Sequence, residues 1–198
     1  MTIYLIRHGE TDWNAALRFQ GREDIPLNRA GAAQALACGR ALAHSGLCAV
    51  YTSPLQRAVA TGQIIAAEAK LPQSAVCPLA ELIERDLGIY SGKSFSDRGK
   101  FFALAGGDTE GMEPFDEVRV RMRAALQKIA ASGLRAVAAV SHGAAINVLL
   151  ADLTNGEMGT GKTKLYNGGI TVREGGAEGF ALAACNLKPE EMALDEKT

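Results

Sequence analysis

Two of the three histidines in this 198-residue chain follow a short apolar run, with one residue between, and directly precede a glycine. His8 follows the run 3–6 and Arg7, and His142 ends a similar segment that begins with the run 136–140. Short apolar runs of this kind predict buried strands, and ligands of open α/β sheets bind outside the carboxyl ends of the strands. An arginine beside an imidazole in that place predicts an anionic ligand that the imidazole attacks.

The residues after each histidine support a site for an anion. Gly9 and Gly143 permit the unusual dihedral angles of a tight strand-to-helix turn. The segment 144–153 is expected to be a helix, and its free backbone N–H groups would point at a bound anion.

Arg57 is the third candidate. The run 49–52 is strand-like, and a helix is expected next, with Ser53 as its N-cap and Pro54 at its first position. Arg57 would then lie in the first turn, where the helix dipole disfavours a cation. A bound anion would explain its presence there, and an exposed surface ion pair is the alternative.

Taken together, these segments resemble the histidine phosphatase superfamily, which includes the cofactor-dependent phosphoglycerate mutases. The matching segments occur in the family's order between residue 3 and about residue 150. They are Arg7-His8-Gly9-Glu10-Thr11, Trp13-Asn14, Phe19-Gln20-Gly21, Ile25-Pro26-Leu27-Asn28, Thr52-Ser53-Pro54-Leu55-Gln56-Arg57-Ala58, Glu84-Arg85-Asp86-Leu87-Gly88 and Ser141-His142-Gly143.

The resemblance implies a role for each matching side chain. His8 would be the nucleophile that becomes phosphorylated, and Glu84 would donate a proton to the leaving group. Arg7, Arg57 and His142 would form a catalytic clamp around the phosphoryl group, and Asn14 would be a further donor to it. The residues expected to bind phosphate or substrate are Arg7, Asn14, Gln20, Gly21, Arg57, His142 and Gly143.

The chemistry explains these residue types. A neutral imidazole avoids the charge repulsion that a phosphate monoester exerts on anionic nucleophiles, and a covalent intermediate splits one hard step into two. Positioning and electrostatic stabilisation of the phosphoryl oxygens do most of the catalysis, and guanidinium groups suit that task. His8 must therefore be neutral at its attacking nitrogen, whereas His142 is more useful as a cation.

The proton donor has two candidates, Glu84 and Glu81. The family pattern places a glycine four residues after the glutamate, which favours Glu84 because Gly88 follows it. Tyr90 and Ser91 depart from the residues common in the family, tryptophan at the first position and an acidic residue or glutamine at the second. These departures affect the expected substrate specificity more than the chemistry.

Strand-like and helix-like segments alternate along the chain, which is typical of an α/β protein. We expect a three-layer sandwich in which helices cover both faces of a mostly parallel central sheet, with short strands or a hairpin at the C-terminal end. Residues 1–187 would form one histidine phosphatase domain, and residues 188–198 a polar tail. The expected strands are 3–7, 49–52, 75–77, 136–140, 164–166, 170–173 and 180–184, and the expected helices are 29–43, 54–69, 115–131 and 144–153.

Composition limits the partners. The formal net charge is −1, so no basic field favours nucleic acid or a membrane surface, and no apolar run approaches the roughly 18 residues that span a bilayer. The four cysteines show no metal-site spacing. We expect a cytoplasmic enzyme without metal or cofactor that acts on a small phosphorylated metabolite, and homodimer formation is left open.

Three functions are compatible with the sequence. Mutases of this family usually carry a long insertion after the catalytic glutamate, and the segment after Gly92 is short here, which favours hydrolysis over phosphotransfer. A phosphatase is therefore the main interpretation and a cofactor-dependent phosphoglycerate mutase the alternative. A binding module without activity is the third, although none of the reactive side chains is missing. The segment Phe101–Pro114 either lines the site, through Phe101, Phe102 and Met112, or is an ordinary connection.

Overall fold

A computed structural model describes residues 1–95, 111–176 and 179–192. A six-stranded sheet forms the middle layer in the order β3-β2-β4-β1-β5-β6. The first four strands in this order are parallel, β5 runs antiparallel to β1, and β6 runs antiparallel to β5. The strands are β1 (Thr2–Arg7), β2 (Ala49–Thr52), β3 (Val76–Pro78), β4 (Ala136–Ser141), β5 (Ile170–Gly176) and β6 (Gly179–Leu187).

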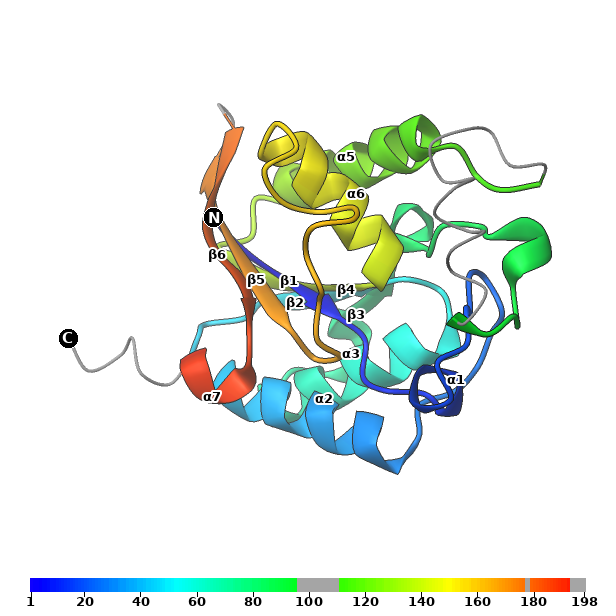
Figure 1. The fold of residues 1–198 in the computed structure, drawn as a ribbon. Coiled ribbons are helices and arrows are strands. Elements are labelled where there is room, and N and C mark those ends of the chain that lie inside the picture. The colour runs from blue at the N-terminus through cyan, green and yellow to red at the C-terminus, as the bar shows by residue number, and fades with distance from the viewer. Residues whose placement is uncertain (96–110, 177–178, 193–198) are drawn as a thin grey trace.

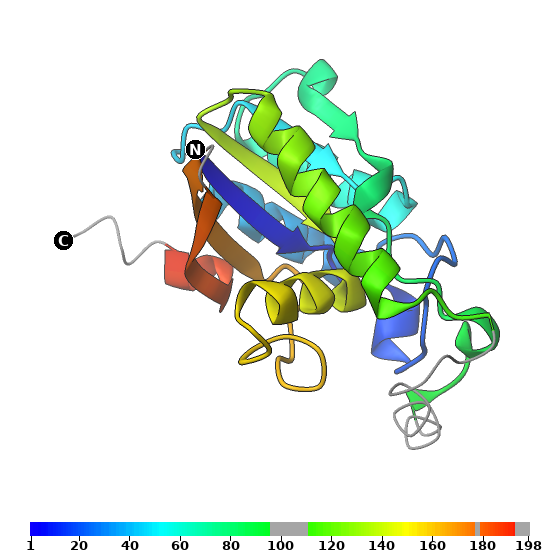
Figure 2. The same cartoon turned by 90° about the horizontal axis from the view of Figure 1, so that it is seen from above.

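Helices cover both faces of the sheet. Figure 1 shows α5 and α6 on one face and α2 and α3 on the other, and Figure 2 shows α5 from above as it crosses the sheet. The mixed three-layer α/β fold expected from the sequence is therefore confirmed. The helices are α1 (Asp12–Ala15), α2 (Arg29–Ala41), α3 (Gln56–Glu68), α5 (Phe115–Ala131), α6 (Gly143–Leu153) and α7 (Pro189–Met192).

Successive side chains of a strand point to opposite faces of the sheet, and apolar side chains on both faces form two apolar cores. On β1, Leu5 packs with the α5 and α6 side of the sheet, and the next residue, Ile6, packs with the α2 and α3 side. All six residues of β4 are buried, because helices cover this parallel strand on both faces. Its residues 136–141 also hold three alanines, whose small side chains let the helices lie close to the centre of the sheet.

The pairing of β1 with β4 brings the two histidines together. Arg7 lies opposite Ser141 in the parallel register, and the backbone N–H of His8 donates to the Ser141 carbonyl at 3.0 Å. His8 and His142 therefore leave the sheet side by side at its carboxyl edge. The parallel register of β1 and β4 positions the two imidazoles, because each strand is followed directly by its histidine.

Close backbone approach fixes the start of α2 against the loop after β1. A Cβ atom on Gly31 would overlap the backbone of Glu10, and one on Gly9 would overlap the backbone of Gly31. The side chain of Glu10 also accepts a hydrogen bond from Asn28 Nδ2 at 3.0 Å. The segment that carries His8 is thereby held against the N-terminus of α2.

Several expected boundaries need correction. The segment 164–166 is not a strand, because Leu165 and Tyr166 bond to the side chains of Arg7 and Asn186 rather than to a neighbouring strand. The helix expected from Pro54 begins at Gln56 instead, and its N-cap position is Leu55.

The last described residues also form structure. Residues 189–192 of the segment expected to be a polar tail make the short helix α7, which packs against α2. Among the described residues, no helix is long and apolar enough to cross a membrane.

Candidate active site

His8 is buried, and both of its ring nitrogens have partners. Arg57 Nε donates to His8 Nε2 at 3.2 Å, so Nε2 is the nitrogen with the free electron pair. Nδ1 must then carry the proton, which it donates to the Gly9 carbonyl at 2.6 Å. The imidazole is therefore neutral, in the state that an attacking nitrogen requires.

The surroundings of His8 also favour the neutral form. Burial lowers its pKa well below 6.5, and the positive charges of Arg57 and Arg7 lower it further. The hydrogen bond to Gly9 opposes this shift only in part. A neutral His8 at physiological pH follows from both geometry and electrostatics.

Arg57 lies in the first turn of α3, as the sequence predicted, and it is fully buried, unlike the exposed surface arginine of the alternative. Besides its contact with His8, it donates to the carbonyl of Gly21 at 2.8 Å and to that of Glu23 at 2.6 Å. Gly21 has a φ of 54°, which turns this loop toward the guanidinium. Burial lowers the pKa of Arg57 to about 10, and the charge of Glu84 opposes that shift.

His142 stands beside His8, with their ring centroids 5.0 Å apart. Its Nε2 lies 2.7 Å from Ser53 Oγ, so Ser53 holds the imidazole and does not cap α3. Burial lowers the pKa of His142 well below 6.5, and the positive charges of Arg57 and Arg7 act in the same direction. These surroundings favour a neutral His142, in contrast with the expected cation.

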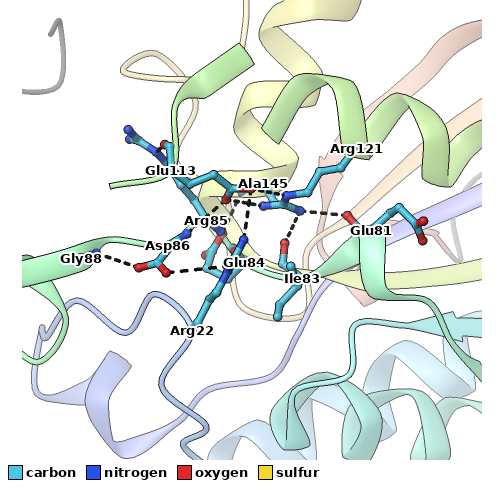
Figure 3. Close-up of polar contacts among 10 residues, drawn as sticks. All are labelled: Arg22, Glu81, Ile83, Glu84, Arg85, Asp86, Gly88, Glu113, Arg121 and Ala145. Atoms are coloured by element: carbon cyan, nitrogen blue, oxygen red, sulfur yellow. Dashed lines mark hydrogen bonds and ion pairs between the residues drawn. The ribbon is translucent and has the colours of Figure 1, made fainter. Parts of the chain in front are cut away.

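Glu84 lies at the N-terminus of α6. Its carboxylate accepts hydrogen bonds from the backbone N–H groups of Ala144 at 3.2 Å and Ala145 at 2.9 Å, and from its neighbour Arg85 at 2.9 Å. The free N–H groups that the sequence assigned to a bound anion thus hold Glu84 in this structure. Figure 3 shows the carboxylate of Glu84 turned toward Ala145.

Glu81 points elsewhere. Its carboxylate pairs with Lys128 on α5 at 2.5 Å, and this contact lowers its pKa. In Figure 3 its side chain extends away from Glu84. Of the two glutamates left open by the sequence, Glu84 is the one that lies with the histidines.

Two buried nitrogen atoms of the site have no partner among the described residues: Arg7 Nε, which is a donor, and His142 Nδ1, which is a donor when it carries a proton. Arg7 Nη1 is held by the Leu165 carbonyl at 2.7 Å, and a Cβ atom on Gly143 would lie 3.4 Å from Arg7 Nε. Buried polar atoms nearly always find a partner. These two atoms therefore fit a ligand that supplies acceptors, such as a phosphate.

Asn14 and Gln20 line the loop after His8. The Oδ1 atom of Asn14 accepts from the backbone and hydroxyl of Thr11, and Gln20 Oε1 accepts from the same hydroxyl at 3.0 Å. These bonds fix the orientation of the Asn14 amide group in the loop after His8. Gln20 is buried, so it supports the loop.

Sequence reasoning missed Asn167. It lies in the turn before β5, and its Nδ2 donates to the His8 carbonyl at 3.0 Å and lies 3.3 Å from Asn14 Oδ1. Gly168, with a φ of 74°, makes the turn that brings it there. An asparagine before a glycine pair signals such a turn, but the sequence does not say which strand end it reaches.

The segment proposed to line the site is described only in part. Phe101 and Phe102 lie outside the described residues, whereas Met112 is buried with Leu87 and Tyr90. Within the described ranges, no cluster of three or more histidine, cysteine, aspartate or glutamate residues could hold a metal ion.

Comparisons with known proteins identify the family of the chain. The family model described as "Histidine phosphatase superfamily (branch 1)" matches residues 3–188. A Bacillus subtilis protein named "Uncharacterized phosphatase PhoE" is 33% identical over 93% of this chain and 94% of its own. A Photorhabdus laumondii protein named "Probable phosphoglycerate mutase GpmB" is 34% identical over 76% of this chain and 73% of its own.

A solved structure shares the architecture. It is a phosphoserine phosphatase variant from Entamoeba histolytica in complex with phosphoserine, with a TM-score of 0.79 and 27% identity. The match covers 94% of this chain and 97% of that one. With a family model that spans nearly all of its length, the chain belongs to the histidine phosphatase superfamily.

Proposed function

We propose that the chain is a phosphomonoester hydrolase that acts through a phosphohistidine on a small phosphorylated metabolite. The observation that carries this proposal is the state of His8. Its Nε2 carries no proton and accepts a hydrogen bond from Arg57, its Nδ1 donates to a carbonyl, and two arginines and a second imidazole surround it. A neutral nucleophile among cationic groups suits attack on a phosphate monoester.

In the first step, His8 Nε2 forms a bond to phosphorus while the bond to the leaving oxygen breaks. Arg7, Arg57 and the Nδ1 atom of His142 bind the phosphoryl oxygens, and Asn14 donates a further hydrogen bond. The bound dianion opposes the charges that now lower the pKa of His142, so binding favours the protonated form that the clamp requires.

Glu84 transfers its proton to the leaving oxygen in the same step. In the second step, the Glu84 carboxylate takes a proton from the water that attacks the phosphohistidine, which releases phosphate and restores the enzyme. Its carboxylate binds Ala144 and Ala145 at the start of α6, immediately after His142 and Gly143, and this position supports the role.

A panel of phosphomonoesters tests the proposal, with inorganic phosphate measured near neutral pH in the presence of a chelator. We expect phosphate release by the wild type and none by His8→Ala, together with an acid-labile phosphoryl group on His8 in a quenched single turnover. His44→Ala is the matched control, because His44 is an exposed histidine. Release that persists in His8→Ala, or that requires a metal ion, would contradict the mechanism.

The mutase alternative is favoured by the relative named as a phosphoglycerate mutase. A mutase would isomerise its substrate in the presence of a bisphosphorylated cofactor and release little phosphate. A binding module would show no turnover of any substrate.

Phosphoserine belongs in the panel because a related phosphatase was solved with it. A cytoplasmic site of action and a single domain over residues 1–187 remain part of the proposal.

A further inference from the structure

The segment that carries Glu84 has little regular structure of its own. It follows a single 3-10 turn, Ala80–Leu82, and runs as a loop to the next turn at 88–90. The bonds from Ala144 and Ala145 orient the Glu84 carboxylate, but they do not fix the backbone that bears it. Other contacts must hold this loop in place.

Arg121 supplies two such contacts from α5, in addition to the bond from Arg22 Nε to the Glu84 carbonyl at 3.3 Å. Its Nη1 atom donates to two carbonyl groups that precede Glu84, that of Glu81 at 2.9 Å and that of Ile83 at 2.5 Å. The side chain is only 15% exposed, so water competes weakly for these bonds. Figure 3 shows Arg121 reaching from the helix to the two carbonyls.

Glu113 completes the arrangement from the other side. Arg121 Nε and Nη2 form a bidentate pair with its carboxylate, at 2.7 and 3.0 Å. One of its oxygens also accepts from the backbone N–H of Asp86 at 3.2 Å, and its own carbonyl accepts from Arg85 Nε at 2.7 Å. The pair therefore holds the backbone before Glu84 and the backbone after it.

The charges of this pair are balanced inside the protein. Burial raises the pKa of the Glu113 carboxyl, but the hydrogen bond and charge of Arg121, with help from Arg22, bring it below its ordinary value. Arg22 Nη2 lies 3.2 Å from Glu113, and Arg22 follows Gly21, whose carbonyl binds Arg57. The loop of the proton donor is thus linked to the loop that holds the phosphate clamp.

We propose that Arg121, paired with Glu113, is a positioning residue that holds the Glu84 loop so that the Glu84 carboxyl group meets the leaving oxygen. The inference rests on the proposed function and adds a residue that touches neither substrate nor reacting atoms. Arg121 lies outside every motif that led to the site, and it acts only through Glu84.

The leaving group gives a specific test. An alkoxide needs the proton of Glu84 as its bond to phosphorus breaks, whereas dinitrophenolate departs with the electron pair and needs none. A loop out of position should therefore slow the hydrolysis of phosphoserine and spare that of dinitrophenyl phosphate. The parameter kcat/KM reports the steps up to phosphohistidine formation, which include this proton transfer.

We expect Arg121→Gln to lower kcat/KM for phosphoserine by about 10- to 100-fold, because a small misplacement of a catalytic group can cost on the order of 100-fold. For dinitrophenyl phosphate the loss should stay below about 3-fold, since general acid catalysis contributes little there. Arg121→Lys should recover part of the phosphoserine activity, because an ammonium group can still reach one carbonyl.

Arg123→Gln is the matched control. Arg123 lies on the same helix and also forms a bidentate pair, with Asp152 at 2.5 and 2.9 Å, but it is 54% exposed, and within the described residues its hydrogen bonds go to Asp152 and not to the Glu84 loop. This variant should hydrolyse both substrates like the wild type. If Arg121→Gln does not fold, Glu113→Gln takes its place in the test, because this substitution keeps the shape of the side chain. Glu113→Gln should show the same selective loss on phosphoserine.

Equal losses on the two substrates, or no loss on either, would overturn the positioning role. A wild type that hydrolyses neither substrate would instead overturn the proposed function. If another alkyl phosphomonoester of the panel is hydrolysed faster than phosphoserine, it takes the place of phosphoserine in the comparison.

Discussion

The two buried histidines make the stability of the fold depend on pH. In the unfolded chain a histidine takes up a proton near pH 6.5, whereas in the folded protein the pKa of His8 and that of His142 lie well below this value. Between the two values the unfolded state binds more protons than the folded state. Lowering the pH through this range therefore favours unfolding.

The size of the effect follows from the linkage relation. If both imidazoles stay neutral in the folded protein, each one lowers the free energy of unfolding by about 1.4 kcal/mol between about pH 7.5 and about pH 5.5. His8 and His142 together should account for about 2.7 kcal/mol. This is a large part of the stability of an ordinary domain, which is about 5–15 kcal/mol.

Urea unfolding followed by circular dichroism measures this effect at each pH. The double variant His8→Gln/His142→Gln carries no titrating group at either position, so its free energy of unfolding should fall less by about 2.7 kcal/mol over the same range. His44→Gln, which removes the exposed histidine, should behave like the wild type. Parallel curves for the wild type and the double variant would refute the reasoning, because the fall would then come from other groups.

Three further results are expected. Gly31→Ala should lower the free energy of unfolding by about 1–3 kcal/mol in urea titrations, because its Cβ would overlap the backbone of Glu10, and an unchanged midpoint would contradict this packing. Glu84→Gln should lower kcat for an alkyl phosphate by about 10²- to 10⁴-fold and Glu81→Gln by less than about 3-fold, and steady-state kinetics that reverse this order would assign the proton donor to Glu81. Cys38 should resist iodoacetamide in the native protein, as judged by mass spectrometry, because burial raises the pKa of its thiol to about 12; rapid labelling without unfolding would disprove its burial.

Local sequence signals predicted the elements best where the ends were marked. The strand Ala49–Thr52 and the helix Phe115–Ala131 have the expected bounds, since a Ser-Pro pair follows the first and a proline precedes the second. The segment 164–166 contains residues that suit a strand, yet its backbone bonds to side chains from distant parts of the chain. That outcome depends on tertiary contacts that no local pattern contains.

The residues of the site also divide into those that local sequence signals predict and those that depend on tertiary contacts. His8, Arg57 and His142 could be found because each is tied to the end of a strand or the start of a helix, and those places meet at one edge of the sheet. Asn167 and Arg121 could not, because they act through carbonyl groups that come near them only after the layers pack. The neutral state of His142 also depends on burial among charges, which the sequence does not specify.

The alignment of β1 with β4 also has a consequence for folding. The two strands lie far apart in the sequence, with β2, β3, α2, α3 and α5 made between them, yet His8 and His142 meet through this one parallel pairing. Parallel pairing over a long sequence separation is slow to form, because loop closure must precede the contacts that reward it. A chain emerging from the ribosome therefore holds no complete site until β4 has been made and has inserted next to β1. In a refolding experiment, the recovery of activity should follow the closing of the sheet centre and lag behind the recovery of helical signal.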